Sequence, residues 1–286
     1  MAHYPVMKEQ VLNWLNLRDG GIYVDATCGY GGHSRYLLEA DKNIVLYGLD
    51  KDADAVKSAS RELAGFKNFK AVHSGYENLD SVLKGEGIEN VDGILMDLGF
   101  STNQIRAGER GFSFQTEGPL DMRYDRREGL TAGEIINTWS RNDLVWIFEN
   151  CGEIKKAGKF VDRIVERRRK KRFETTVELA DFIKQLCRHK TKIHPATKFF
   201  MALRIAANNE TEVIKEGLTK AAGALKKKGR LVVISFHSIE DRIVKRFFRD
   251  NAELEALTKK PLTADKKELA ENPESRSAKL RACKKV

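Results

Sequence analysis

The chain has 286 residues, of which 41% are hydrophobic, and its formal net charge at neutral pH is +10. This length and apolar content can build one large or two smaller globular domains, which argues against a disordered protein. The first ten residues lack a signal-peptide pattern and no apolar run approaches the roughly 18 residues that cross a bilayer, so we expect a soluble, cytoplasmic enzyme without membrane association.

The first hundred residues alternate between strand-like and helix-like segments. Short runs rich in β-branched residues predict strands, and amphipathic runs between them predict helices. The expected strands are Ile22–Ala26, Ile44–Asp50, Phe69–Ser74 and Val91–Leu98, and the expected helices are Ser34–Ala40 and Asp52–Leu63. Such βαβ alternation predicts a mostly parallel, Rossmann-like sheet.

The alternation stops near residue 104 and a charged, helix-rich segment follows to residue 193. Helices are expected there at Ala132–Trp139, Asn142–Glu149, Ala157–Arg172 and Thr176–Cys187. The α/β pattern then resumes, with helices at Phe199–Ala207 and Glu212–Lys227, a strand at Arg230–Phe236 and a last edge strand near Ser277–Arg281. We therefore predict an α/β domain formed by residues 1–104 and 194–286, with residues 105–193 as an inserted helical domain.

A glycine-rich loop follows the first predicted strand. That strand ends in Asp25, and Gly29, Gly31 and Gly32 follow. Glycine lets the backbone approach a ligand where a Cβ would collide, and the second strand ends in Asp50, 19 residues after Gly31, a position suited to ribose hydroxyls. The spacing predicts a nucleotide-type ligand.

Two classes of cofactor fit such a loop, the nicotinamide dinucleotides and S-adenosylmethionine. Dinucleotide-binding loops place their glycines directly after the strand, where the pyrophosphate meets a helix N-terminus, whereas here Asp25 comes first. A carboxylate repels a pyrophosphate and suits the ammonium and sulfonium of S-adenosylmethionine. The loop therefore favours a methyltransferase over a dehydrogenase.

A third carboxylate, Asp97, ends the strand Val91–Leu98 and is followed closely by Phe100. Ligands of open α/β sheets lie at the carboxyl ends of the strands, so we expect Asp25, Asp50 and Asp97 to share one crevice. Each carboxylate alone could instead cap a helix.

Asp97 and Phe100 favour methylation of an exocyclic amine on a base. The lone pair of such an amine is delocalised into the ring, and an acceptor such as Asp97 on its N–H returns electron density to nitrogen. Phe100 could stack on a base lifted from its neighbours. Methylation of cytosine carbon 5 would need a thiolate, and Cys28 is the one cysteine in a candidate motif, so nitrogen is the better target.

His237 and Ser238 follow the strand Arg230–Phe236 and are weaker catalytic candidates at the same sheet edge. A strand-end histidine is about as often a structural group as a catalytic one. The four cysteines are scattered without a Cys-x-x-Cys pair, so neither disulfides nor a metal site is predicted.

The positive charge is concentrated in residues 155–172, where ten Lys or Arg residues face two acidic ones. Clusters of one sign bind phosphate backbones through counterion release, so RNA or DNA is the expected partner, although a solvated helix end is the alternative. The predicted RNA-binding residues are Arg167, Arg168, Arg169, Lys170, Lys171 and Arg172, with Arg110, Arg123 and Arg204 added as candidates that could instead pin loops.

Motifs along almost the whole chain resemble those of the bacterial 16S ribosomal RNA cytosine-N4 methyltransferase family, also called the RsmH or MraW family. The motifs are His3–Val6, Asp25–His33, Asp97–Gly99 with Gln104, Arg110–Phe114, Pro119–Arg123, His194–Thr197, Leu203–Ile205, Ile234–Arg242 and Ser277–Arg281. The resemblance implies a class I S-adenosylmethionine-dependent methyltransferase with a helical insert, acting on N4 of a cytidine in the decoding centre of the small ribosomal subunit.

The resemblance also implies residue roles. Gly31, Gly32 and His33 would contact the cofactor, Asp50 would hold its ribose, and the pocket would be completed by Tyr76, Asp97 and Gln104. The chain departs from the family pattern at Phe100, Thr102, Met201 and Asn209, which concerns the base pocket more than the cofactor loop. DNA amino-methylation, a non-catalytic role in ribosome assembly, and a homodimer remain open from the sequence.

Overall fold

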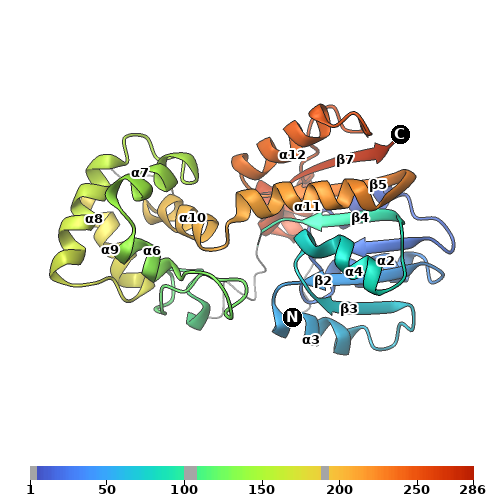
Figure 1. Cartoon of the computed structure of the whole chain (residues 1–286), viewed down its shortest axis with the longest axis horizontal. Helices are drawn as coiled ribbons and strands as arrows, with labels where there is room; N and C mark the ends of the chain where they lie inside the picture. The colour runs from blue at the N-terminus through green and yellow to red at the C-terminus, as the bar shows by residue number, and fades with distance from the viewer. Residues whose placement is uncertain (1–4, 100–107, 188–192) are drawn as a thin grey trace. The chain divides into compact units, whose positions relative to one another are not determined.

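The computed structural model describes residues 5–99, 108–187 and 193–286. Its contacts divide the chain into two compact units, the first formed by Met1–Gly99 with Thr211–Val286 and the second by Phe100–Glu210 (Figure 1). We expected the boundaries at residues 104 and 194, whereas the contacts place residues 194–210 in the second unit. Helices long enough to cross a bilayer and sufficiently apolar are absent from the described part of the chain.

The first unit is built on a seven-stranded sheet with the strand order β3-β2-β1-β4-β5-β7-β6. The strands are β1 (Ile22–Asp25), β2 (Val45–Asp50), β3 (Phe69–His73), β4 (Val91–Asp97), β5 (Leu225–Ser235), β6 (Leu254–Ala256) and β7 (Lys279–Lys285). Strands β1 to β5 pair in parallel, and β7 pairs antiparallel with both β5 and β6. The predicted mostly parallel α/β sheet is confirmed.

Side chains of the central strands alternate between two hydrophobic cores. Ile94 and Met96 of β4 belong to one core, and Leu95 between them belongs to the other. This period of two is the geometry of a strand that is buried on both faces. It also fixes which faces of the sheet the helices must cover.

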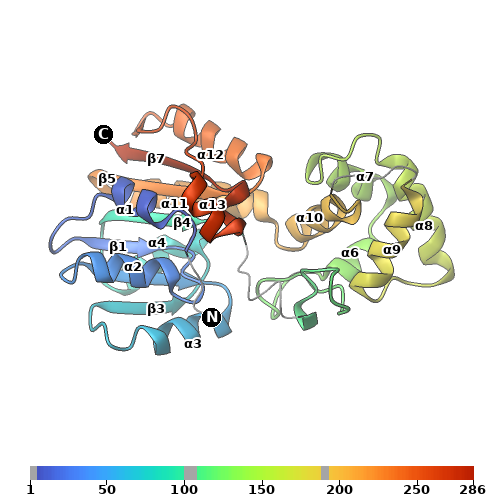
Figure 2. The ribbon, with the colours of Figure 1, turned by 180° about the vertical axis from the view of Figure 1, so that it is seen from behind.

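Helices cover both faces of the sheet. The first core receives side chains from α4 (Leu79–Gly85), α11 (Glu210–Ala224) and α12 (Ser238–Asp250). The second receives α1 (Lys8–Leu15) and α2 (Gly32–Ala40), which lie on the opposite side of the sheet (Figure 2). The remaining helices of this unit are α3 (Ala53–Glu62) and the short α13 (Lys266–Glu271).

The C-terminal strand differs from our expectation. We predicted an edge strand near Ser277–Arg281, but β7 covers Lys279–Lys285 and lies inside the sheet, between β5 and the true edge strand β6. Leu280, Ala282 and Cys283 are consequently fully buried. Arg281 between them and the lysines on either side obscured this burial in the sequence.

The second unit is helical, as the sequence pattern predicted. It contains α6 (Ala132–Thr138), α7 (Arg141–Asn150), α8 (Gly158–Lys170), α9 (Thr176–Leu186) and α10 (Ala196–Ala207). Phe199 of α10 packs edge-on against Phe148 of α7, with ring centroids 4.8 Å apart. This contact makes α10 part of the helical core rather than a cover for the sheet.

Candidate active site

The carboxyl ends of β1, β2 and β4 bring three aspartates to one edge of the sheet. The parallel register sets Asp25 beside Gly48 and Leu95, so Asp50 and Asp97 each lie two residues further toward the same edge. Ligands of open α/β sheets bind at this edge. The predicted convergence of Asp25, Asp50 and Asp97 therefore follows from the strand pairing.

Asp25 is completely buried and anchors the first turn of α2. Its Oδ2 accepts a 2.7 Å hydrogen bond from the hydroxyl of Ser34, and its Oδ1 accepts one from the backbone N–H of Thr27. Burial raises the pKa of Asp25, although these hydrogen bonds and the nearby His33 oppose the shift. Asp25 therefore fixes the loop between β1 and α2.

Asp50 ties the glycine loop to the end of β2. Its Oδ2 accepts a 2.8 Å hydrogen bond from the N–H of Gly29, and its Oδ1 accepts a 2.8 Å hydrogen bond from the N–H of Asp52. Burial raises the pKa of Asp50 to about 6. The carboxylate is held in place but is costly to ionise until a donor or a cation approaches it.

Asp97 ends β4 opposite His33, the second residue of α2. The backbone N–H of Asp97 donates a 2.6 Å hydrogen bond to Thr27 Oγ1, and His33 Nε2 lies 3.4 Å from Asp97 Oδ2. Burial lowers the pKa of His33, but the carboxylates of Asp97 and Asp25 outweigh it and leave that pKa above its usual value.

Several buried polar atoms at this edge have no hydrogen-bond partner among the described residues. They are Asp97 Oδ1 and both ring nitrogens of His33. The 3.4 Å contact of His33 Nε2 with the other carboxylate oxygen, Asp97 Oδ2, is an ion pair without hydrogen-bond geometry. Because unpaired buried polar atoms are costly, this donor and acceptor set fits a polar ligand, and the excess of carboxylates fits a cation such as S-adenosylmethionine.

The glycines of the loop differ in why they are needed. Gly29 has φ +51°, and a Cβ there would meet nothing within 4 Å, which leaves open space beside the loop. Gly31 has φ +88°, precedes the first residue of α2, and would place a Cβ 3.1 Å from Leu63 Cδ1. Gly31 therefore serves helix packing and backbone conformation, while Gly32 begins α2.

Tyr76 lies in the short 3-10 turn Tyr76–Asn78 after β3. Its ring packs so closely on Gly217 of α11 that a Cβ at Gly217 would lie 2.2 Å from Tyr76 Cδ2. Nearby, Lys51 Nζ and Glu77 Oε1 form a 2.7 Å ion pair above Gly75, and the other Glu77 oxygen is buried without a hydrogen-bond partner among the described residues.

His237 and Ser238 lie where β5 leads into α12. His237 is the N-cap of α12, and its Nδ1 accepts the N–H of Glu240 at 3.4 Å. Glu240 Oε2 in turn accepts the N–H of Phe236 at 2.8 Å and of His237 at 3.2 Å. These contacts form a capping box, so the geometry gives His237 a structural task at the helix start.

The arginines proposed from outside the basic run are engaged within the second unit. Arg110 donates to the carbonyls of Arg123 and Tyr124, and Arg123 forms a two-point ion pair with Asp121. Arg204 forms a buried two-point ion pair with Glu210 at 2.8 and 3.0 Å. These contacts pin loops and helix ends together.

Residues of the basic run also divide into two groups. Arg168 donates to the carbonyls of Ile136 and Trp139, and Arg167 pairs with Glu178. Lys171 lies 3.4 Å from Glu178, whereas Arg169, Lys170 and Arg172 are exposed and form no ion pair with any described residue. These last three present positive charge to solvent at the end of α8 and just after it.

Some predicted residues lie outside the described part of the chain, namely Phe100, Thr102 and Gln104. Conversely, the sequence analysis missed Thr27, Ser34, Lys51 and Glu77, which contact or neighbour the strand ends. Thr27 follows Asp25 by two residues, so the parallel register could have placed it level with Asp97. Asn209, a departure from the family pattern, has φ +48°, a conformation that asparagine tolerates well.

A sequence model described as the MraW methylase family matches residues 1–286. The chain is 48% identical to ribosomal RNA small subunit methyltransferase H of Sulfurihydrogenibium sp. over 294 residues, and the alignment covers all of both chains. It is 45% identical to the protein of the same name from Persephonella marina over 293 residues, again with both chains fully covered.

Among solved structures, the chain is similar to a protein described as a candidate rRNA methylase from Clostridium thermocellum. The TM-score is 0.50 at 12% identity, and both chains are fully covered. At this level of identity the likeness shows the fold alone. It agrees with the class I methyltransferase architecture that the motifs implied.

Proposed function

The chain belongs to the MraW methylase family, and from this membership and its strand-end site we propose that it methylates N4 of a cytidine in the decoding centre of 16S ribosomal RNA. It is an S-adenosylmethionine-dependent methyltransferase, and the cofactor supplies the methyl group. Curated relatives named ribosomal RNA small subunit methyltransferase H support the choice of RNA.

The observation that carries the proposal is Asp97 Oδ1 at the end of β4, which is buried and has no hydrogen-bond partner in the part of the chain that the structure describes. An amine N–H donated to this oxygen would satisfy it and would localise the nitrogen lone pair as the methyl group is transferred. The carboxylate can also receive the proton that the methylated nitrogen loses. No covalent intermediate with the protein is needed.

Other residues at this edge hold the cofactor in the proposal. Asp50 accepts from the ribose hydroxyls, Gly29 leaves room beside the loop, and Asp25 adds negative charge near a sulfonium. Gly31, Gly32, His33 and Tyr76 complete the cofactor site that the resemblance implies. Positioning supplies most of the rate enhancement, because the site would hold the methyl donor and the amine nitrogen in line at short distance.

The helical insert is proposed to hold the RNA through the exposed Arg169 and Lys170 at the end of α8 and Arg172 just after it. The substrate would be the small subunit, assembled or nearly so, and a ribosomal substrate favours a cytoplasmic location. Arg110, Arg123 and Arg204 are engaged in internal contacts, so we propose that they shape the insert that presents this charge.

Nucleoside analysis tests this function. Purified protein is incubated with S-adenosylmethionine labelled in its methyl group and with small subunits from cells that lack the modification. The expected product is labelled N4-methylcytidine at one position of the 16S RNA. Label in parallel duplex or single-stranded DNA, or label on another RNA atom, would contradict the proposed substrate.

A further inference from the structure

Helix α12 carries four basic side chains on one exposed face. Arg242, Lys245, Arg246 and Arg249 recur at the spacing i, i+3, i+4 and i+7, and all four are exposed. On the opposite face, Val244 and Phe248 are buried in the first of the two hydrophobic cores. We call the four basic residues the α12 stripe.

Exposed faces of other helices on the sheet carry both signs of charge. On α3, Lys57 and Arg61 are accompanied by Asp54 and Glu62. On α11, Lys215 forms a 2.7 Å ion pair with Glu212 one turn away. Such mixed faces are what a helix facing only water usually shows, because opposite charges at this spacing support the helix.

The exposed side chains of α12 carry four positive charges, those of the α12 stripe, and one negative charge, that of Asp250. Arg249 pairs with Asp250 at 2.6 Å, but Asp241 at the start of the helix is taken by Arg281 of β7 at 2.7 Å. Like charges one turn apart destabilise a helix by a few tenths of a kcal/mol per pair. An exposed face with this excess of positive charge is suited to an anionic partner.

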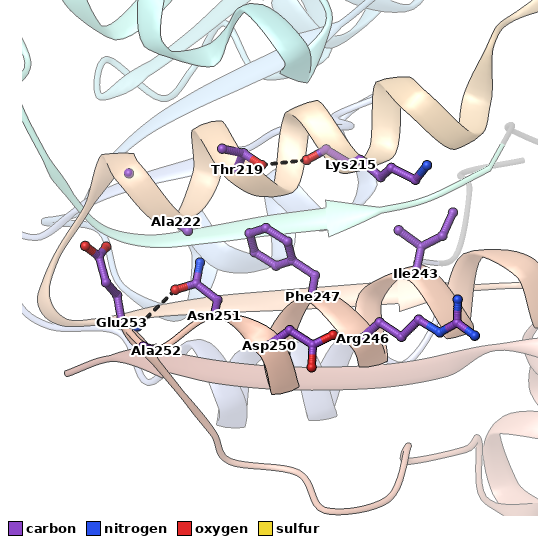
Figure 3. Close-up of a pocket in the computed structure, with 11 residues that line it drawn as sticks. Lys215, Thr219, Ala222, Ile243, Arg246, Phe247, Asp250, Asn251, Ala252 and Glu253 are labelled. Atoms are coloured by element: carbon purple, nitrogen blue, oxygen red, sulfur yellow. Dashed lines mark hydrogen bonds between the residues drawn. The ribbon is translucent and has the colours of Figure 1, made fainter.

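A groove of about 800 Å³ runs beside the stripe, between α11 and α12. Figure 3 shows Lys215 and Arg246 at one end of the groove, Phe247 in the middle, and Glu253 at the other end. Lys215 is paired with Glu212, so Arg246 makes this end cationic, and β4 points toward it, so the cationic end faces the same sheet edge as Asp97. The acidic end of the groove would repel an anion, so a bound anion is expected at the cationic end.

We propose that the α12 stripe and the cationic end of the groove form a second RNA-binding surface, on the catalytic unit itself. The stripe spans about 10 Å along the helix, the distance covered by roughly three phosphates of one strand in a duplex. Its ligand is the backbone of the RNA that carries the target nucleotide. This inference rests on the proposed function for the identity of the nucleic acid and adds a surface that the basic insert does not supply.

Aromatic and apolar side chains in the groove support RNA over a generic polyanion. Ile243 and Phe247 are partly buried beside Arg246, and single-stranded RNA is bound by grooves that combine cations for phosphates with apolar or aromatic surface for bases. Phosphate contacts position the nucleic acid without reading its sequence, so the stripe would set the course of the strand toward the sheet edge.

The test replaces three stripe residues together, Arg242→Gln, Lys245→Gln and Arg246→Gln, in the full-length protein. Fluorescence anisotropy would follow binding of a labelled single-stranded RNA with the sequence around the target cytidine, over a range of salt concentrations. Each lost phosphate contact lowers the slope of log affinity against log salt by about 0.7, so three contacts lower it by roughly two.

The matched control is Lys57→Gln, Arg61→Gln and Lys67→Gln, which removes the same charge from exposed positions in and after α3. This variant should retain the wild-type slope. An unchanged slope in the stripe variant would overturn the inference, and an equal loss in the control would overturn it as well, because net charge alone would then explain binding.

Two further readouts separate this inference from the proposed function. The stripe variant should keep the wild-type affinity for S-adenosylmethionine, since no stripe residue lies among the strand-end carboxylates. If the wild-type protein forms N4-methylcytidine but the stripe variant keeps the wild-type salt slope, the second RNA-binding surface is rejected and the proposed reaction stands. A reduced slope without any N4-methylcytidine from the wild type would reject the proposed reaction and leave the surface standing.

Discussion

His33 Nε2 lies 3.4 Å from Asp97 Oδ2, which joins the start of α2 to the end of β4 in a buried ion pair. The histidine also feels the carboxylate of Asp25, so its surroundings favour the charged imidazolium despite burial. The pair holds one oxygen of Asp97 and leaves the other without a partner among the described residues. This arrangement orients a carboxylate toward the ligand edge of the sheet.

The charge of His33 gives the stability of the ligand-free protein a pH dependence. Its pKa in the folded protein lies above the unfolded value, so its contribution is fully present below pH about 6.5 and is lost as the pH rises through the folded pKa. We expect His33→Ala to lower the melting temperature more at pH 6 than at pH 9. Thermal unfolding by circular dichroism at both values measures this, and an equal loss would contradict the ion pair.

Asp50 should couple cofactor affinity to pH. Its pKa of about 6 means that the carboxylate which accepts from the ribose is partly protonated in mildly acidic solution. We expect the affinity for S-adenosylmethionine to fall as the pH drops below about 6 in the wild type. Calorimetric titrations from pH 5 to 8 should show that Asp50→Asn binds S-adenosylmethionine weakly and that its affinity changes less with pH. Wild-type affinity in that variant would exclude Asp50 as the ribose acceptor.

The ring of Tyr76 can occupy its position because Gly217 has no side chain. Gly217→Ala would put a Cβ 2.2 Å from the ring, so we expect Tyr76 to be displaced and cofactor affinity to fall about tenfold. Gly223→Ala on the same helix is the control, because a Cβ there meets nothing within 4 Å and alanine favours a helix by up to about 1 kcal/mol. Equal affinities in the two variants would place Tyr76 outside the cofactor pocket.

Arg204 should matter for folding rather than for direct RNA contact. Removing one partner of its buried pair with Glu210 leaves an uncompensated charge, so Arg204→Ala is expected to cost about 3 kcal/mol of stability. Neutralising the exposed Arg169, Lys170 and Arg172 should leave stability unchanged and weaken RNA binding. Chemical denaturation and anisotropy on both variants would separate the two effects, and the reverse pattern would contradict the assignment.

The sheet and its ligand edge could be predicted because the relevant signals are local. A strand that ends in Asp25 and breaks into glycines needs only its neighbours to be recognised, and parallel pairing then brings Asp50 and Asp97 to the same edge. The buried interior position of β7 could not be predicted, since it depends on antiparallel pairing with β5, about 50 residues earlier in the sequence.

Long-range contacts also decide what individual charged residues do. The basic run reads as one cluster in the sequence, yet Arg168 reaches the carbonyls of Ile136 and Trp139 while Arg169 faces solvent. The sequence left His237 open between a catalytic and a structural role, and only the fold shows that Glu240 completes a capping box with it. The α12 stripe was not predicted, because its residues are separated in the sequence and come together only on the surface of the helix.

The most direct test of the account is the rate of N4-methylcytidine formation by Asp97→Ala under single-turnover conditions, with the affinity for S-adenosylmethionine measured on the same preparation. Loss of the hydrogen-bond acceptor should slow methyl transfer at least a hundredfold, while cofactor affinity changes by no more than about threefold. Methyl transfer at the wild-type rate would show that Asp97 does not act on the amine and would contradict the proposed site.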